Sequence, residues 1–124
     1  MSEIGEDERA VRVVIEQYIQ SYLSADVTAL RDVFAHDAIM NGFVGERLVE
    51  GTPEPFLQNV ASNPPLNGSD FQPEYNIEHV SLTNNAASVI VREINFGPYN
   101  FTDYMHLLKR DGVWKIISKT FTTY

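Results

Sequence analysis

The sequence predicts an α+β fold in which three N-terminal helices pack on an antiparallel sheet. Up to about residue 62, apolar residues recur every three or four positions, which is the spacing of amphipathic helices. From about residue 70 they alternate with polar residues, and β-branched and aromatic side chains dominate. The chain has 124 residues, and this length suits a single domain over residues 1–124.

The three helices have different signals. Residues 7–24 carry an apolar stripe that includes Val11, Ile15 and Ile19, and acidic residues begin the segment where the helix dipole favours them. Asp26 can cap a short second helix with Leu30, Val33 and Phe34 in its buried stripe. In the third helix Thr52 is the predicted cap and Pro53 the first residue. It should end before Asn63-Pro64-Pro65, and residues 63–72 should form a loop.

Four strands are predicted over residues 74–82, 86–96, 101–109 and 113–122. Asn84-Asn85 and Asp111-Gly112 are two-residue hairpin signals, and a four-residue turn is expected over residues 97–100. Turn positions set the register, and the register decides which side chains share a face of the sheet.

This register places one group of residues on the face towards the helices: Tyr75, Ile77, His79, Ile90, Arg92, Ile94, Asp103, Met105, Leu107, Trp114, Ile116, Ser118 and Thr120. The other face should carry Val91, Glu93, Tyr104, Leu108, Ile117, Lys119 and Phe121, among others. Both faces hold large apolar side chains, and the helices can cover only one. We therefore expect a homodimer through the outer face, and Phe121→Asp should dissociate it.

Composition excludes several classes of function. The net charge is −8 without any concentrated basic segment, which argues against nucleic acid and anionic membranes as partners. The absence of cysteine excludes disulfides and thiolate chemistry. Apolar runs are much shorter than a membrane span, and the N-terminus is too polar for a signal peptide. The expected location is the cytoplasm.

Two segments carry a resemblance to a known superfamily. Phe34-Ala35-His36-Asp37-Ala38 resembles the "F-x-x-D-A" segment of nuclear transport factor 2-like proteins. Residues 101–109 and 111–121 resemble the closing hairpin of the putative lumazine-binding, SnoaL-like branch. The resemblance covers residues 8–122. It implies a cone of three N-terminal helices on a curved antiparallel sheet, a homodimer, and a pocket between the first helix and the concave face. It does not decide the activity, because members of this superfamily have many activities.

The resemblance also concerns catalysis. Isomerase and cyclase members of the superfamily use a carboxylate base shortly after this segment. Here that position falls at about Asn41 or Gly42, and neither side chain can accept a proton. This departure argues against an isomerase mechanism that uses the family's base, and it leaves Asn41 as a candidate ligand contact.

Asp103 is the main candidate for chemistry in the predicted pocket. The register makes Arg92 its diagonal neighbour, among Met105 and Trp114. The two charges could form a structural ion pair, or Asp103 could contact a ligand or act catalytically. Tyr18 and Tyr22 lie one helical turn apart, and they could be core aromatics or point their hydroxyls into the pocket.

The three histidines, His36, His79 and His106, share no metal-ligand spacing, so no metal site is predicted. No motif for a phosphate or dinucleotide cofactor is present, and no cofactor is expected. The register places His79 on the face of the pocket, where it could act as an acid–base group.

Two classes of function remain. The first is a pocket protein without catalysis that binds a small, partly aromatic molecule. The second is a lyase, isomerase or cyclase that acts on a similar or polyketide-like molecule through Asp103 and His79. In both, we expect the ligand between Tyr18 and Tyr22 on the helix and Arg92, Asp103, Met105 and Trp114 on the sheet.

Overall fold

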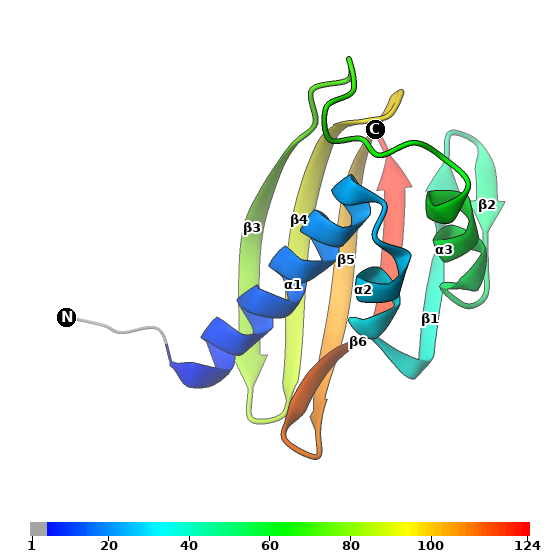
Figure 1. Ribbon diagram of the computed structural model, residues 1–124. Helices are drawn as coiled ribbons and strands as arrows, with labels where there is room; N and C mark the ends of the chain where they lie inside the picture. Colours follow the sequence, from blue (N-terminus) through cyan, green and yellow to red (C-terminus); the bar gives the residue numbers. More distant parts are fainter. Residues whose placement is uncertain (1–4) are drawn as a thin grey trace.

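A computed structural model describes residues 5–124 and shows three helices on one face of a six-stranded sheet (Figure 1). The first four residues, which include part of the polar N-terminus discussed above, lie outside the described residues. The helices are α1 (Glu6–Ser24), α2 (Val27–Asp32) and α3 (Glu54–Ala61). The predicted α+β class and the position of all three helices are confirmed. No helix among residues 5–124 has the length and apolarity to span a membrane.

Local signals explain where the short helices begin. The carboxylate of Asp26 accepts a hydrogen bond from the backbone N–H of Ala29, as predicted for the cap of α2. Helix α3 begins one residue later than predicted, since Pro53 is its N-cap. The Thr52 hydroxyl still accepts a hydrogen bond from the N–H of Glu54.

The sheet has the order β2-β1-β6-β5-β4-β3. The strands are β1 (Phe34–Val44), β2 (Arg47–Val49), β3 (Glu74–Thr83), β4 (Ala86–Phe96), β5 (Tyr99–Arg110) and β6 (Val113–Thr123). The last four are the predicted meander. Strands β1 and β2 were not predicted, and β1 runs parallel to β6, so the sheet is mixed rather than wholly antiparallel.

The predicted register is wrong along β4 because the middle turn is shorter than expected. Phe96 pairs with Tyr99 across the two-residue turn Gly97-Pro98, and a bulge at Ile94 and Asn95 follows. Asp103 therefore lies opposite Val91 instead of Ile94. This shift of three positions is odd, so it exchanges the two faces of β4.

Two further bulges exchange faces within β6 and β3. The register shifts between the pairs His106–Ser118 and Leu107–Ile116, which leaves Ile117 as the extra residue of β6. Lys119 and Phe121 consequently point to the helices, where Ser118 and Thr120 were expected. His79 pairs with Ile90 and shares its outer face, and a bulge at Glu78 places Ile77 on the opposite face, beside Val91.

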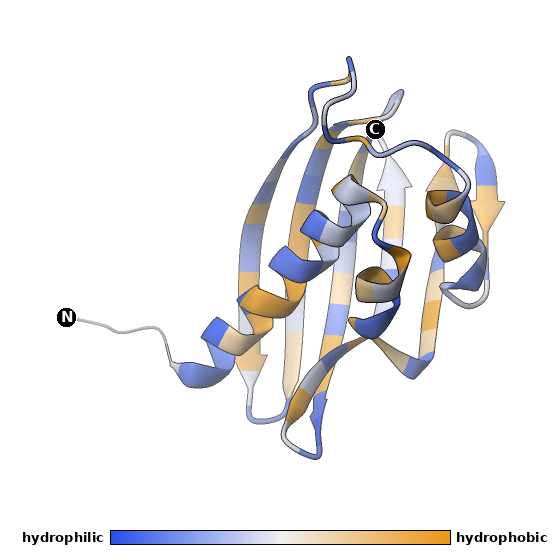
Figure 2. Cartoon of the chain, in the orientation of Figure 1, coloured by the Kyte–Doolittle hydropathy of each residue, from blue (hydrophilic) through white to orange (hydrophobic). Residues whose placement is uncertain are grey.

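The core lies between the helices and the concave face of the sheet. Buried apolar residues of α1 and of the central strands pack together there, and Figure 2 shows apolar residues along these elements. The buried residues include Ile15 and Ile19 of α1, Val89 and Val91 of β4, and Met105 of β5. All three helices lie on this side, so no helix of the described residues covers the convex face (Figure 1).

Candidate functional site

The candidate site is a cleft of about 1300 Å³ at one end of the concave face. Helix α3, the loop of residues 62–73 and the β1–β2 hairpin form its rim, and the inner face of β4–β6 forms its floor. Seven aromatic side chains line it: Tyr22, Phe56, Phe71, Phe96, Tyr99, Phe101 and Phe121. Of the charged side chains in the lining, Arg47, Glu50 and Asp70 are exposed at the rim, whereas Glu93 and Lys119 are buried. This combination is typical of small-molecule sites.

Lys119 lies at the centre of a buried cluster, with 3% of its surface exposed. Its ammonium donates to the hydroxyl of Tyr18 at 2.5 Å and lies 4.0 Å from Oδ2 of Asp103. It also lies 4.1 Å from the ring centroid of Phe56, 5.1 Å from that of Phe121 and 5.8 Å from that of Tyr22. Cation–π attraction and the nearby carboxylate offset part of the cost of burying this ammonium.

Asp103 is fully buried behind the floor of the cleft. Its Oδ2 accepts a hydrogen bond from the Tyr18 hydroxyl at 3.2 Å, and its Oδ1 has no hydrogen-bond partner among the described residues. Burial, and secondly the charge of Asp103, raise the pKa of Tyr18 well above 10. Tyr18 is therefore a neutral donor that links helix α1 to the charged groups of the sheet.

Glu93 is the most unusual residue of the site, because it is fully buried and neither carboxyl oxygen has a hydrogen-bond partner among residues 5–124. Burial raises the pKa of Glu93 well above its usual value, and the charge of Asp103 raises it further. The charge of Lys119 opposes this rise in the pKa of Glu93. The buried site therefore favours the protonated form of Glu93 more than water does.

The structure brings together only part of the predicted site. Tyr18, Tyr22 and Asp103 belong to it or lie directly behind it. Met105 is buried in the core, and Trp114 is buried at the other end of α1, where its indole N–H donates to Asp7 at 3.1 Å. Asn41 accepts a hydrogen bond from the N–H of Gly51 and does not line the cleft.

Arg92 and His79 are corrected because the register places both on the convex face. Arg92 forms an ion pair with Glu78 at 2.5 Å and donates to Thr102 at 3.0 Å, so it does not pair with Asp103. His79 is exposed on the face of the sheet opposite to the cleft. It cannot act together with Asp103 on one ligand.

Glu93 and Lys119 were assigned to the outer face in the sequence analysis, and that assignment is wrong. Both lie on strands whose faces are exchanged by a bulge, at Ile94 and Asn95 in β4 and at Ile117 in β6. The one available signal was their charge. Glu93 follows Val89 and Val91 at alternate positions of its strand. Lys119 lies in the same way between Ile117 and Phe121, so each charge stands in an otherwise apolar series.

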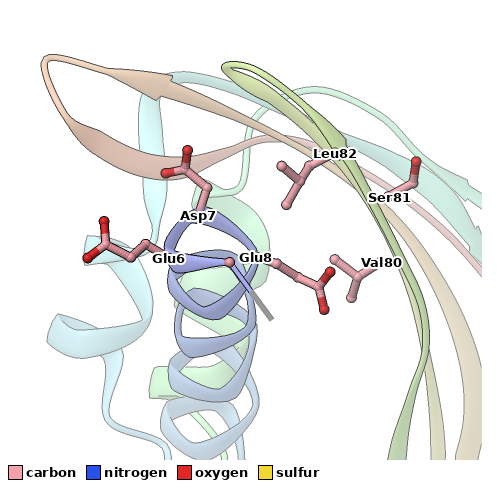
Figure 3. A pocket seen from close by; sticks show the side chains of 7 residues that line it. Glu6, Asp7, Glu8, Val80, Ser81 and Leu82 are labelled. Atoms are coloured by element: carbon pink, nitrogen blue, oxygen red, sulfur yellow. The ribbon is translucent and has the colours of Figure 1, made fainter. Parts of the chain in front are cut away.

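A second hollow of about 610 Å³ lies between the start of α1 and strand β3 (Figure 3). Its polar lining includes Glu6, Asp7 and Glu8, beside Val80 and Leu82. Asp7 is already bound by Lys109 at 2.9 Å, and Glu8 by Arg12 at 3.1 Å. No cluster of three or more metal-ligating side chains occurs in the described part of the chain, here or at the cleft. The aromatic cleft is therefore the better candidate.

Comparisons with known proteins agree with this architecture. The family model described as putative lumazine-binding matches residues 6–122. No functionally curated protein matches the sequence. A nuclear transport factor 2-like protein of unknown function from Methylobacillus flagellatus KT has 24% identity and a TM-score of 0.88, over 98% of this chain and 96% of that one.

Two other solved structures extend the comparison. A nuclear transport factor 2-like protein of unknown function from Shewanella baltica OS155 has 24% identity and a TM-score of 0.84, over 100% of this chain and 98% of the other. A ketosteroid isomerase-like protein from Erwinia carotovora atroseptica SCRI1043 has 17% identity and a TM-score of 0.70, over 97% and 98%. These structures show the fold alone. Since the family model covers nearly the whole chain, the protein belongs to the putative lumazine-binding family, and its fold is that of the nuclear transport factor 2-like structures.

Proposed function

We propose that this protein binds a small, largely aromatic molecule in the cleft, with a polar end of the molecule at Glu93 and Lys119. The observation that carries the proposal is Glu93, a buried carboxyl group without a hydrogen-bond partner that lines an aromatic cavity. An unsatisfied buried polar group costs roughly 1–3 kcal/mol. A ligand that supplies its partner recovers that free energy, while the aromatic walls bury the body of the ligand.

The test is binding of a panel of two-ring aromatic compounds, followed by thermal shift and by native mass spectrometry of the purified protein. Phe56→Ala removes a wall of the cleft and should weaken binding by about tenfold or more, as the loss of a buried ring predicts. Phe43→Ala is the matched control, because Phe43 is exposed and does not line the cleft. An equal loss of affinity in both variants, or no binding of any compound of the panel to the unmodified protein, would contradict the proposal.

Acid–base catalysis is the second candidate, and the carboxyl pair of Glu93 and Asp103 favours it. A neutral acid beside a carboxylate, an ammonium and a tyrosine hydroxyl can move a proton at a bound carbonyl compound. The similarity to a protein called ketosteroid isomerase-like is consistent with this idea. In the mechanism we propose, Glu93 takes the place of His79, because His79 lies on the other face.

Proton exchange distinguishes binding from catalysis. The unmodified protein is incubated with 2-tetralone in D₂O, and deuterium uptake next to the carbonyl is followed by NMR. A catalyst should accelerate the uptake, and Glu93→Gln should abolish the acceleration because an amide cannot exchange this proton at a useful rate. Uptake at the uncatalysed rate leaves binding as the function.

A further inference from the structure

The charges at the floor of the cleft do not balance if both carboxyl groups are ionised. The ammonium of Lys119 lies 4.0 Å from Oδ2 of Asp103, so Asp103 is its charge partner. Glu93 forms no ion pair of its own within residues 5–124, and it is as fully buried as Asp103. An uncompensated buried charge is costly, so the cluster holds one proton on Glu93. The raised pKa of Glu93 agrees with this count.

The position of that proton determines what Glu93 offers to a ligand. Oδ2 of Asp103 is already occupied by Tyr18, whereas Oδ1 is without a partner among the described residues. A protonated Glu93 carries an O–H donor, and Oδ1 of Asp103 is a carboxyl oxygen of the same cluster that still lacks a partner within residues 5–124. The second oxygen of Glu93 remains an acceptor on a side chain that lines the cleft.

Lys119 offers the complementary group. Its ammonium has three N–H donors. One bonds the Tyr18 hydroxyl, and a second suffices for Oδ2 of Asp103 at 4.0 Å. The third has no recorded acceptor in residues 5–124, and Lys119 lines the same cleft as Glu93. Tyr22 lies beside this ammonium, which is 5.8 Å from its ring centroid.

We infer that the floor of the cleft recognises the edge of a neutral planar ring on which an N–H donor adjoins a C=O acceptor, as in a lactam. The N–H of the ring donates to the free oxygen of Glu93, and the ring carbonyl accepts from Lys119. The ring body lies among Tyr22, Phe56 and Phe121. This inference rests on the proposed binding function and specifies its ligand class.

Four two-ring probes of nearly equal shape test the inference by calorimetric titration. They are quinolin-2(1H)-one, its N-methyl derivative, the anion 2-naphthoate and the cation 2-naphthylmethylammonium. The unmodified protein should bind the quinolinone about tenfold or more tightly than the N-methyl compound, because one hydrogen bond to a buried group is lost. Both charged probes should bind more weakly still, since they disturb a balanced cluster. This comparison does not depend on the folding of any variant.

Three variants identify the groups involved. Glu93→Gln keeps an N–H donor for Asp103 and a carbonyl acceptor for the ligand, so it should preserve the preference for the quinolinone. Glu93→Met removes the acceptor and should abolish the preference. Lys119→Met should lower the affinity for both the quinolinone and its N-methyl derivative. His79→Gln, on the exposed convex face, is the control and should change nothing.

The outcomes separate this inference from the proposed function. Equal binding of all four probes overturns the lactam inference and leaves the cleft as a general aromatic site. Tightest binding of the cation, lost in Glu93→Gln, overturns it as well, because Glu93 would then be ionised. Failure of all four probes to bind at millimolar concentration overturns both the inference and the proposed function for ligands of this shape.

Discussion

The buried cluster of Glu93, Asp103, Lys119 and Tyr18 determines how this protein responds to single substitutions. Each member depends on the ionisation state of the others, because they share one buried region with a single cation. Removing one charge therefore changes the protonation of a neighbour, and effects within the cluster should not add.

Glu93 should make the protein less stable as the pH rises. Its pKa in the folded protein lies above the value of 4.5 expected for the unfolded chain, so the folded state holds the proton more tightly. The stabilisation is complete below about pH 4.5 and is lost as the pH rises towards the folded pKa. Four titratable side chains face Glu93: Asp103, Lys119, Tyr18 and Tyr22. The charge of Asp103 raises the pKa of Glu93, and the charge of Lys119 lowers it.

The measurement is urea unfolding of the unmodified protein and Glu93→Gln between pH 5 and 8. The free energy of unfolding of the unmodified protein should fall relative to the variant by up to about 1.4 kcal/mol per pH unit in the interval between the two pKa values. Partner groups lower the pKa values of the carboxylates of Asp7 and Asp37. Their contribution to the stability of the protein is therefore lost at acidic pH, and equally in both proteins. Parallel curves would show that Glu93 is not the group that titrates.

Asp103→Asn should destabilise the protein because Lys119 loses its charge partner. Breaking a buried pair costs about 3–5 kcal/mol when nothing replaces the lost charge. Here Glu93 can ionise and take over part of that role, so the loss should be smaller in the single variant than in the Glu93→Gln background. A double-mutant cycle by urea unfolding measures this coupling, and additive losses would contradict it. Asp32→Asn, at the exposed pair with Lys115, is the control and should have little effect.

Bulges and turns limited how much of the site could be predicted from the sequence. Periodicity and turn residues predicted α1, α2, α3 and strands β3–β6 within a few residues, because each signal is local. The faces were wrong wherever one residue was added or lost, as at Asn95, Ile117 and Glu78. A bulge leaves no composition signal strong enough to detect, yet it decides whether Lys119 faces the core or solvent.

Strand β1 escaped prediction for a related reason. Phe34 and Ala38 are buried, but the segment contains His36, Asp37, Asn41 and Gly42, which do not alternate like a solvated strand. Its partner β6 is far away in sequence and parallel to it, so no hairpin turn marks the pairing. Tertiary pairing, rather than local propensity, makes this segment a strand.

Gly42 of β1 lies directly against Phe121 of β6. A Cβ atom there would lie 2.1 Å from the carbonyl oxygen of Phe121 and 2.6 Å from its ring. Gly42→Ala should therefore destabilise the protein by about 1–3 kcal/mol, as overpacking usually does. The added methyl group should also displace the Phe121 side chain, which lines the cleft, and so weaken ligand binding there.

Thermal unfolding of Gly42→Ala provides the measurement. Gly5→Ala is the control, because a Cβ atom at Gly5 meets nothing within 4 Å. A melting temperature for Gly42→Ala equal to that of the unmodified protein would mean that β1 can move away from β6 without cost.

At the scale of the whole molecule, the two faces of the sheet differ in what covers them. The concave face is filled by helices and by the cleft, whereas no described helix lies on the convex face (Figure 1). Large apolar side chains are nevertheless exposed there: Ile39, Phe43, Ile94 and Tyr104. They come from β1, β4 and β5, and Tyr104 lies between Ile90 and Thr120 in the register. Exposed apolar side chains gathered over one face are typical of an interaction surface.

We propose that a second copy of the chain covers this convex face, because a twofold axis lets one apolar surface bury itself against its equivalent. The residues at the centre differ from those expected from the sequence: Val91, Glu93, Lys119 and Phe121 face the core, so Tyr104 takes their place.

Tyr104→Asp should lower the mass in analytical ultracentrifugation at micromolar concentration to that of one chain, while the circular dichroism spectrum stays unchanged. Phe121→Asp, by contrast, should unfold the protein, since Phe121 is buried among Phe101 and Lys119. A monomeric mass for the unmodified protein, or a dimer that survives Tyr104→Asp, would show that the exposed apolar side chains are not a self-association surface.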